Sequence, residues 1–505
     1  MAEKKKGSLT LIAFIFMISN FLVKIMGLLR DMLLAGFYGT SMNTDAYIIA
    51  NNIPSVLFAA IGASIATTFV PMYSRIKEEY NEERANSFTI HFIEIIIGTC
   101  IVLTLAGEAF TMQFVKIFAS GFEGALLSLT VSFAKILFPS IFGMALMNVM
   151  GAYLQQHNTF RPIALVPIFG NGTIILALLL SKWLNNIYIL VWGTLVGNIF
   201  QVLFYIPWVV KTGLLKRKNV SFREDEHIRK ILILVVPIFI GEAANEINTI
   251  VDRSLVSGLG IGSVSAMNYA YKIINLVIGV FVASIGTVVF PKLSKEAAQR
   301  DYASLSKNAS NAICLVAAVM LPVMVSVIIF RTEIVQILFE RGNFNSTSTF
   351  MTSGALAWYS IGLLGMGARE ILAKLFFSIQ NTKIPMLNGF ICAGTNIVLD
   401  LILIRFMGIN GAAFATAIVA VISSLILARN ALKKNLLSMT ILRESFIKTF
   451  MSGVVLAGIE LLFCMIINST ITEHLLNLGL KIIAGGLCCG VYFFAQSKMH
   501  NLKKL

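Results

Sequence analysis

The chain has 505 residues, of which 57% are hydrophobic and 13% are charged, and its formal net charge is +15 at pH 7. A soluble protein carries roughly 25% charged residues, so the composition argues against a cytosolic enzyme, a disordered tail protein and a nucleic-acid binder. It indicates an integral membrane protein. We expect the excess of Lys and Arg to lie in cytoplasmic loops beside anionic lipid.

Fourteen apolar segments are long enough to cross a membrane as helices, since about 20 apolar residues span about 30 Å of hydrocarbon. They lack the alternating pattern of membrane barrel strands. The first segment has no small-residue cleavage site, so we expect an uncleaved span. The predicted spans lie near residues 9–37, 46–74, 86–107, 125–154, 161–181, 187–210, 231–257, 264–291, 308–330, 347–377, 384–404, 409–428, 446–467 and 475–497.

The positive charges of the loops predict the orientation of these spans. Loops on the side of the N-terminus hold 27 Lys and Arg residues, and loops on the other side hold five. Because cytoplasmic loops are the positive ones, we expect both termini in the cytoplasm.

The two halves of the chain resemble each other at an offset of about 220 residues. FVPMYSR (69–75) matches VFPKLSK (289–295), and Asp31 falls on Asp252. Each copy begins on the same side and holds six spans, which is typical of a parallel repeat about an axis along the membrane normal. The predicted parts are an N-lobe at 1–215, a cytoplasmic linker at 216–230, a C-lobe at 231–435, and two further helices with a tail at 436–505.

Eight basic residues fall inside predicted spans: Lys24, Arg30, Lys135, Arg253, Lys272, Arg369, Lys374 and Lys481. A charge at the bilayer centre costs about 2.5 to 3.5 kcal/mol on insertion scales, so each needs a wet cavity or a partner. We expect Arg253 and Lys481, near span ends, to reach the headgroups. Glu370 and Lys374 have the spacing of a local ion pair.

Lys24 and Arg30 share the first span with Asp31. Arg30 and Asp31 point about 100° apart around a helix, so Asp31 cannot neutralise both cations on one face. If the repeat is real, Lys272 faces the same central space from the other lobe. This pattern predicts a cationic cavity suited to phosphate or carboxylate. In the alternative, these charges pair with Asp31, Glu242 or Glu246 and only fix the packing of the lobes.

A second group of polar residues lies in the predicted C-lobe. Asn396 and Asp400 are one helical turn apart, Thr416 is expected to face them from the next span, and Asp252 is a further carboxylate in a span. Oxygen ligands of these kinds suit a hard cation. An Asx pair that hydrogen bonds to neighbouring helices is an equally good interpretation.

Four stretches of the chain resemble the MurJ (MviN) family of lipid II flippases, in a larger group with multidrug and polysaccharide exporters. They are KIMGLLRDMLLAGFYGTSMNTDAYIIANNIPS (24–55), GSVSAMNYAYKIINLVIGVFVASIGTVVFPKLSK (262–295), LFERGNFNSTST (338–349) and FFSIQNTKIP (376–385). The resemblance implies an all-α polytopic protein of about fourteen helices, with two lobes in a V-shaped, MATE-like architecture. It also implies an inner-membrane location and movement of undecaprenyl-pyrophosphate-linked peptidoglycan precursor to the outer leaflet.

The resemblance also implies roles for single residues. Lys24, Arg30 and Asp45 fall on functional positions of the family's first lobe, and Lys272 on its second-lobe basic position. A sodium site described in some members maps onto Asp252, Asn396, Asp400 and Thr416, with a backbone carbonyl near Ala412. The chain departs from the family at Asn52, where members often have a basic residue, and at Phe58, where another arginine is frequent.

These observations predict a lipid II flippase that works by alternating access, with a substrate site of Lys24, Arg30, Asp31, Asp45, Asn52 and Lys272. We expect no enzymatic activity, no required cofactor apart from a possible bound Na⁺, no nucleic-acid partner and a monomer. The alternatives are a flippase for a capsule or O-antigen repeat and a cation-coupled multidrug exporter. A membrane glycosyltransferase fits less well, because no predicted loop exceeds about 20 residues and no paired carboxylates suit acid–base catalysis.

Overall fold

The computed structural model describes residues 19, 22–216, 246–470 and 474–498, and all regular secondary structure in these ranges is helical. The chain divides into two compact units, Met1–Ile261 and Gly262–Leu505. The all-α fold is therefore confirmed. The V-shaped arrangement of two lobes stays a prediction, as do the domain boundaries, and residues 217–230 of the predicted linker lie outside the described residues.

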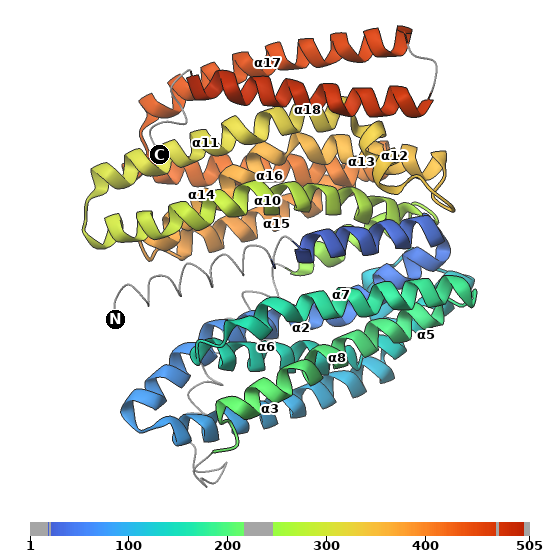
Figure 1. The fold of residues 1–505 in the computed structure, drawn as a ribbon, viewed down its shortest axis with the longest axis vertical. Helices are drawn as coiled ribbons and strands as arrows, with labels where there is room; N and C mark the ends of the chain where they lie inside the picture. The colour runs from blue at the N-terminus through green and yellow to red at the C-terminus, as the bar shows by residue number, and fades with distance from the viewer. Residues whose placement is uncertain (1–18, 20–21, 217–245, 471–473, 499–505) are drawn as a thin grey trace. The chain divides into compact units, whose positions relative to one another are not determined.

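The labelled helices run in chain order through both units (Figure 1). The first unit contains α2 (Met42–Glu79), α3 (Glu82–Ala109), α4 (Thr111–Phe118), α5 (Gly124–Leu137), α6 (Ser140–Gln156), α7 (Phe160–Trp183) and α8 (Tyr188–Thr212), together with helical residues 22–38 and 246–257. The second contains α10 (Ser263–Ala298), α11 (Tyr302–Ile329), α12 (Arg331–Phe339), α13 (Ser346–Ile361), α14 (Leu363–Ser378), α15 (Lys383–Met407), α16 (Ile409–Lys433), α17 (Met439–Thr470) and α18 (His474–Lys498).

The helices of the two units follow one another at matching intervals. The starts of α3 and α11 are 220 residues apart, and those of α7 and α15 are 223 residues apart. Each unit also has a short helix after a long one: α4 follows α3 in the first unit, and α12 follows α11 in the second. These intervals agree with the internal duplication predicted from the sequence.

Two predicted spans, 125–154 and 347–377, are each divided into two helices in the structure, although the first still forms one candidate membrane span, Gly124–Gln156. The first breaks at Phe138 and Pro139, between α5 and α6. Proline has no backbone N–H for the helical ladder. The second breaks at Gly362, between α13 and α14, where a Cβ atom would lie 2.7 Å from the Cα of Ala417 on α16. Glycine thus permits the close approach of α16 at this break.

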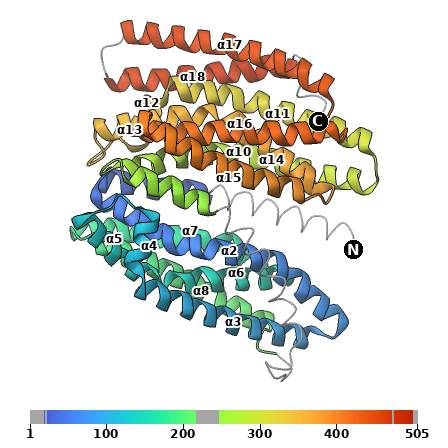
Figure 2. The same cartoon turned by 180° about the vertical axis from the view of Figure 1, so that it is seen from behind.

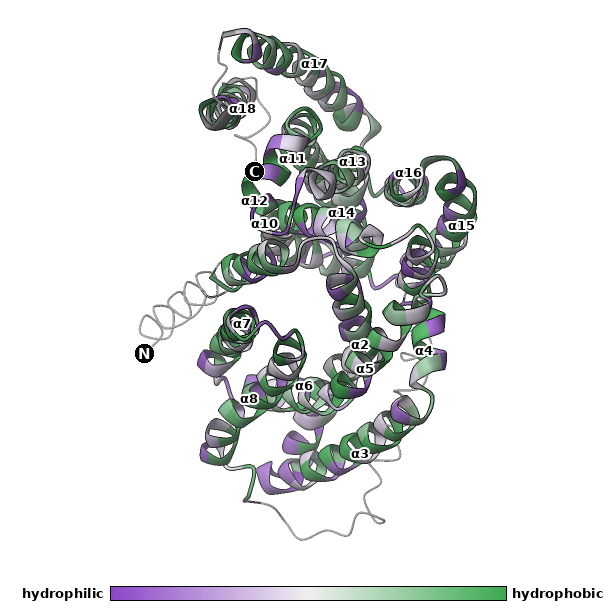
Figure 3. Ribbon diagram, turned by 90° about the vertical axis from the view of Figure 1, so that its right-hand side faces the viewer, coloured by the Kyte–Doolittle hydropathy of each residue, from purple (hydrophilic) through white to green (hydrophobic). Residues whose placement is uncertain are grey.

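Ten helical segments among the described residues are long and apolar enough to cross a membrane, and hydrophobic residues run along most of α3 and α17 (Figure 3). Much of the predicted first and seventh spans lies outside the described residues. The last two helices, α17 and α18, form a hairpin that packs on α11 (Figures 1 and 2). This hairpin belongs to the second unit and has no counterpart in the repeat.

Candidate functional site

The first-lobe candidates lie on helical residues 22–38 and on α2. Ser41 caps the start of α2, where its side chain accepts a hydrogen bond from the Thr44 N–H. Asp45 follows in the first turn and is fully buried, and a negative charge is favourable at a helix N-terminus. Asn52 is half-buried and lies two turns further on, on the same face of α2 as Asp45.

Arg30 is held by two oxygen acceptors. Its Nε and Nη2 donate to Asp31 Oδ1 at 3.1 and 3.0 Å, and its Nη1 donates to Asn171 Oδ1 of α7 at 3.0 Å. The Arg30 side chain is 29% exposed and the Asp31 side chain 8%. The pairing of Arg30 with Asp31 is therefore present, as in the alternative interpretation, and the guanidinium is fixed between its own helix and α7.

Further polar side chains surround this pair. Tyr47 of α2 interacts electrostatically with Arg30, and its hydroxyl lies 2.8 Å from Thr194 Oγ1 of α8. Lys24 is half-buried and lies two turns before Asp31 on the same helix face. The sequence analysis missed Tyr47 and Asn171. An amide in the middle of the apolar stretch 161–181 was the available signal for Asn171.

The second-lobe candidate Lys272 lies on α10 and is half-buried. The preceding residue, Tyr271, places its ring 5.5 Å from the ring of Tyr359 on α13. Lys24 and Arg30 belong to one compact unit and Lys272 to the other. Their convergence on one cavity stays a prediction.

Four of the five predicted cation ligands lie on the packed helix pair α15–α16. Asn396 Nδ2 donates to Asp400 Oδ2 at 2.7 Å, and both residues are buried. Thr416 Oγ1 donates to the Ala412 carbonyl at 3.1 Å. Carboxylate, amide, hydroxyl and carbonyl oxygens are ligands that suit a hard cation. Asp252 lies in the first unit, where Asn248 Nδ2 is 3.5 Å from its Oδ2, so the five residues as one site remain a prediction.

Two other predicted charges have clear partners. Lys374 Nζ lies 3.1 Å from Glu370 Oε1, which confirms the expected local ion pair. Lys481 of α18 was expected to reach the headgroups, and this was wrong, because its Nζ lies 2.8 Å from Glu333 Oε1 of α12. Both side chains of this pair are nearly buried, at 10% and 13% exposed. A buried acid on a neighbouring helix satisfies Lys481 without contact with the headgroups.

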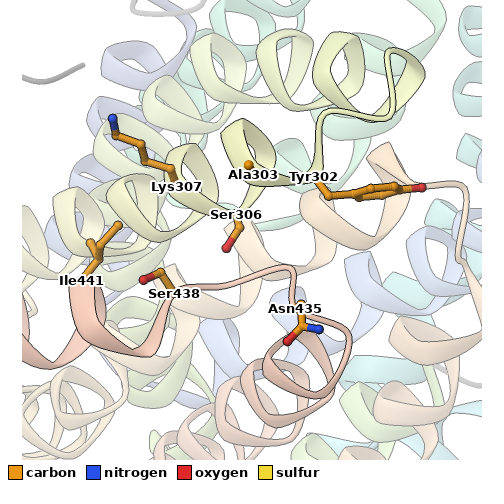
Figure 4. Close-up of a pocket in the computed structure, with 7 residues that line it drawn as sticks. All are labelled: Tyr302, Ala303, Ser306, Lys307, Asn435, Ser438 and Ile441. Atoms are coloured by element: carbon orange, nitrogen blue, oxygen red, sulfur yellow. The ribbon is translucent and has the colours of Figure 1, made fainter.

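A pocket of about 450 Å³ lies where the start of α11 meets the turn between α16 and α17 (Figure 4). Its lining is partly polar and includes Lys307, Ser306 and Ser438. The remaining lining residues are Tyr302, Ala303, Asn435 and Ile441. The candidate site contributes no residue to this lining, so the pocket is a separate feature of the second unit.

Comparisons with known proteins cover most of the chain. A family model described as lipid II flippase MurJ matches residues 34–484. The probable lipid II flippase MurJ of Buchnera aphidicola subsp. Acyrthosiphon pisum is 27% identical over 449 residues, which cover 88% of this chain and 87% of that protein. A solved structure of lipid II flippase MurJ in an inward closed conformation has a TM-score of 0.83 and 27% identity, covering 96% of this chain and all of that one.

A more distant structure shares the fold alone. It is an inward-facing multidrug resistance transporter of the MATE family in the MOP superfamily, with a TM-score of 0.71 and 14% identity. The alignment covers 82% of this chain and 94% of that transporter. The helical architecture is thus shared with exporters of other cargo.

Proposed function

Because this chain belongs to the lipid II flippase MurJ family, we propose that it carries lipid II across the membrane by alternating access between its two lobes. The chain is a multi-pass membrane protein of a transporter family. Moving a lipid-linked headgroup between leaflets breaks no covalent bond, so the proposal needs positioned charge and no catalytic group.

The observation that supports this mechanism best is the arrangement around Arg30. Its guanidinium is fixed by Asp31 and Asn171 and stays 29% exposed. A guanidinium fork matches the oxygens of a phosphate. In our proposal, the pyrophosphate of the substrate replaces Asp31 at Nε and Nη2, while Asn171 keeps Nη1. Asp31 then serves as the resting partner of Arg30.

The other candidates complete the proposed site. An anion loses its hydration on entering the protein, which is unfavourable unless cations replace the water. Lys24 from the first lobe and Lys272 from the second supply these charges, and Asn52 of α2 borders the headgroup. Asp45, which is buried on the same face of α2, supports this border from behind. The lobes then rock, and the polyprenyl tail stays in lipid.

A bound Na⁺ is a further part of the proposal. The oxygens of Asn396, Asp400, Thr416 and the Ala412 carbonyl, with Asp252, would hold the ion. Movement of one elementary charge through 100 mV is worth about 2.3 kcal/mol, so a bound cation supplies a bias on the cycle. We further propose an inner-membrane monomer with both termini in the cytoplasm, as the 27 basic loop residues on the N-terminal side favour.

The decisive experiment is the double substitution Arg30→Ala and Lys272→Ala in cells depleted of their own flippase. We expect normal membrane levels of the variant and no rescue of growth. Lys135→Ala and Arg369→Ala are matched controls, because these two basic residues are exposed, and each should rescue. Full rescue by the double variant would overturn the proposed anion clamp.

A second measurement tests the cargo. Purified protein in vesicles should flip lipid II and should flip a capsule-type polyprenyl-linked repeat much more slowly. Faster flipping of the capsule-type lipid would favour the alternative function, for which the neutral Asn52 and Phe58 were the motivating residues.

A further inference from the structure

The C-terminal hairpin carries a buried carboxyl group that the transport mechanism does not use. Glu460 lies on α17 and is fully buried. It precedes the end of α17 at Thr470 by ten residues, which corresponds to about 15 Å along a helix. Glu460 also falls inside the predicted span 446–467, so we expect it to lie within the hydrocarbon region and away from the headgroups.

The polar contacts of Glu460 come from two neighbouring helices. Ser326 Oγ of α11 donates to Glu460 Oε1 at 2.6 Å. The same Ser326 oxygen lies 3.2 Å from Cys489 Sγ of α18, so the thiol can donate to the hydroxyl that donates to the carboxyl. Glu460 Oε2 is buried and has no hydrogen-bond partner among the described residues.

The groups around Glu460 carry no compensating positive charge in the described part of the chain. The thiols of Cys488 and Cys489 on α18 interact electrostatically with Glu460, and α11 presents the neutral Ser326. The nearby cluster of Leu456, Cys488 and Tyr492, with Val325 and Phe493 against it, is largely apolar. The basic residue of α18, Lys481, is bound to Glu333 of α12.

These contacts fit the neutral form of the acid. An ionised carboxylate in an apolar interior needs a cation or several donors in place of its water, and Glu460 receives one donor. The protonated acid leaves at most one polar group unsatisfied. We propose that Glu460 is a proton-binding site, occupied at neutral pH, that joins the α17–α18 hairpin to α11.

Glu333 provides the contrast within the same region. It is nearly as well buried, but Lys481 supplies a positive charge at 2.8 Å. Lys481 thus supplies Glu333 with the compensating charge that Glu460 lacks. Loss of the proton from Glu460 would instead place a lone negative charge between α11, α17 and α18, and would weaken the attachment of the hairpin.

Infrared difference spectroscopy on the full chain in lipid vesicles tests the occupancy of the site at pH 7. Subtraction of the Glu460→Gln spectrum from the wild-type spectrum should reveal the carbonyl band of a protonated carboxylic acid. The matched difference with Glu333→Gln should reveal only the bands of an ionised carboxylate. Carboxylate bands alone in the Glu460 difference would overturn the proposal.

Thermal unfolding in detergent tests the consequence for the hairpin. A proton held by the folded chain and released on unfolding makes stability fall as pH rises. The wild type should therefore lose unfolding temperature relative to Glu460→Gln between about pH 5 and pH 9. It should show no such decline relative to Glu333→Gln, because that variant keeps Glu460. Parallel profiles for the wild type and Glu460→Gln would contradict the proposed proton site, whatever the outcome for lipid II transport.

Discussion

The helix pair α7–α8 of the first lobe corresponds to α15–α16 of the second, yet the two pairs are held together differently. Ala177 precedes Asp400 by the same 223 residues that separate the starts of α7 and α15. Ala177 packs closely against Gly193 of α8, whereas Asp400 is fully buried and accepts a hydrogen bond from Asn396. The duplication thus preserved helix lengths and breaks, and the second copy alone carries a buried acid at this place.

The two lobes also differ in titratable residues at two other matched positions of the repeat. Gln113 on the short helix α4 is exposed, and Glu333, 220 residues later on α12, is paired with Lys481. The C-cap residue of α6 is His157, and that of α14 is Ile379. Each lobe therefore has its own set of titratable groups on a common framework, and substitutions at matched positions can separate their roles.

The largest effect on stability is expected at the ion pair of Lys481 and Glu333, which has no counterpart in the first lobe. Lys481→Met leaves Glu333 buried without its cation, which should cost about 3 to 5 kcal/mol of stability. The double substitution Lys481→Met and Glu333→Leu should recover most of this loss, because neither charge is then buried. Chemical unfolding in detergent measures both.

Arg75→Ala is the control for this pair. Arg75 and Glu79 are exposed at 71% and 42%, so the loss of this solvent-screened ion pair should leave stability nearly unchanged. If the double variant Lys481→Met and Glu333→Leu were no more stable than Lys481→Met alone, burial of an unpaired charge would not explain the loss of stability.

The next effect tests the apolar pair α7–α8. In Gly193→Ala the new methyl group would meet the Cβ of Ala177, and overpacking of this kind costs about 1 to 3 kcal/mol. Gly98→Ala on α3 is the control, because no atom lies within 4 Å of its added Cβ. Thermal unfolding should show a clear loss for the first variant and none for the second. Equal stabilities would mean that α7 and α8 can separate without cost.

A smaller effect on stability is expected at the polar pair of Asn396 and Asp400 on α15, the helix that corresponds to α7. Asp400→Asn keeps the size of the side chain but removes the charge that accepts from Asn396, which should cost about 1 kcal/mol. If the proposed Na⁺ site is correct, replacement of sodium by choline should lower the unfolding temperature of the wild type and leave that of Asp400→Asn unchanged. The same sodium response in both would exclude Asp400 as a ligand.

Much of the fold could be predicted from the sequence, because long apolar runs and the offset of about 220 residues determine where helices lie along the chain. The breaks at Pro139 and Gly362 could not be predicted in this way, because the mean hydropathy of a long segment is insensitive to an interruption of one or two residues. At Gly362 the reason is a contact with Ala417 of α16, which lies far along the chain.

The candidate site shows the same limit. The spacing of Asn396 and Asp400 predicted a pair one turn apart, and the structure contains it. Asn171 is 141 residues from Arg30, and Glu333 is 148 residues from Lys481. Side-chain partners at such separations depend on how helices pack, and helical periodicity carries no information about that packing.

The smallest effect concerns pH and depends on a histidine of the first lobe that has no counterpart at the matched position of the second. His157, between α6 and α7, hydrogen bonds through Nε2 to the Tyr73 hydroxyl at 2.8 Å, and Glu82 Oε1 lies 3.7 Å from its Nδ1. Burial lowers the pKa of His157, with a further contribution from the positive charge of Lys77, while Glu82 opposes the change. The folded chain therefore binds this proton less tightly than the unfolded chain.

The sign of the pH effect follows from this difference. The contribution of His157 to stability is complete above the unfolded pKa of about 6.5 and is lost as pH falls through the lower, folded pKa. We expect the unfolding temperature of the wild type to decline as pH falls below about 6.5 relative to that of His157→Gln, which has no titrating ring. Ile379→Val at the matched C-cap should leave the wild-type profile in place. If the relative decline were absent from the comparison with His157→Gln, the acid sensitivity of the first lobe would have to come from another group.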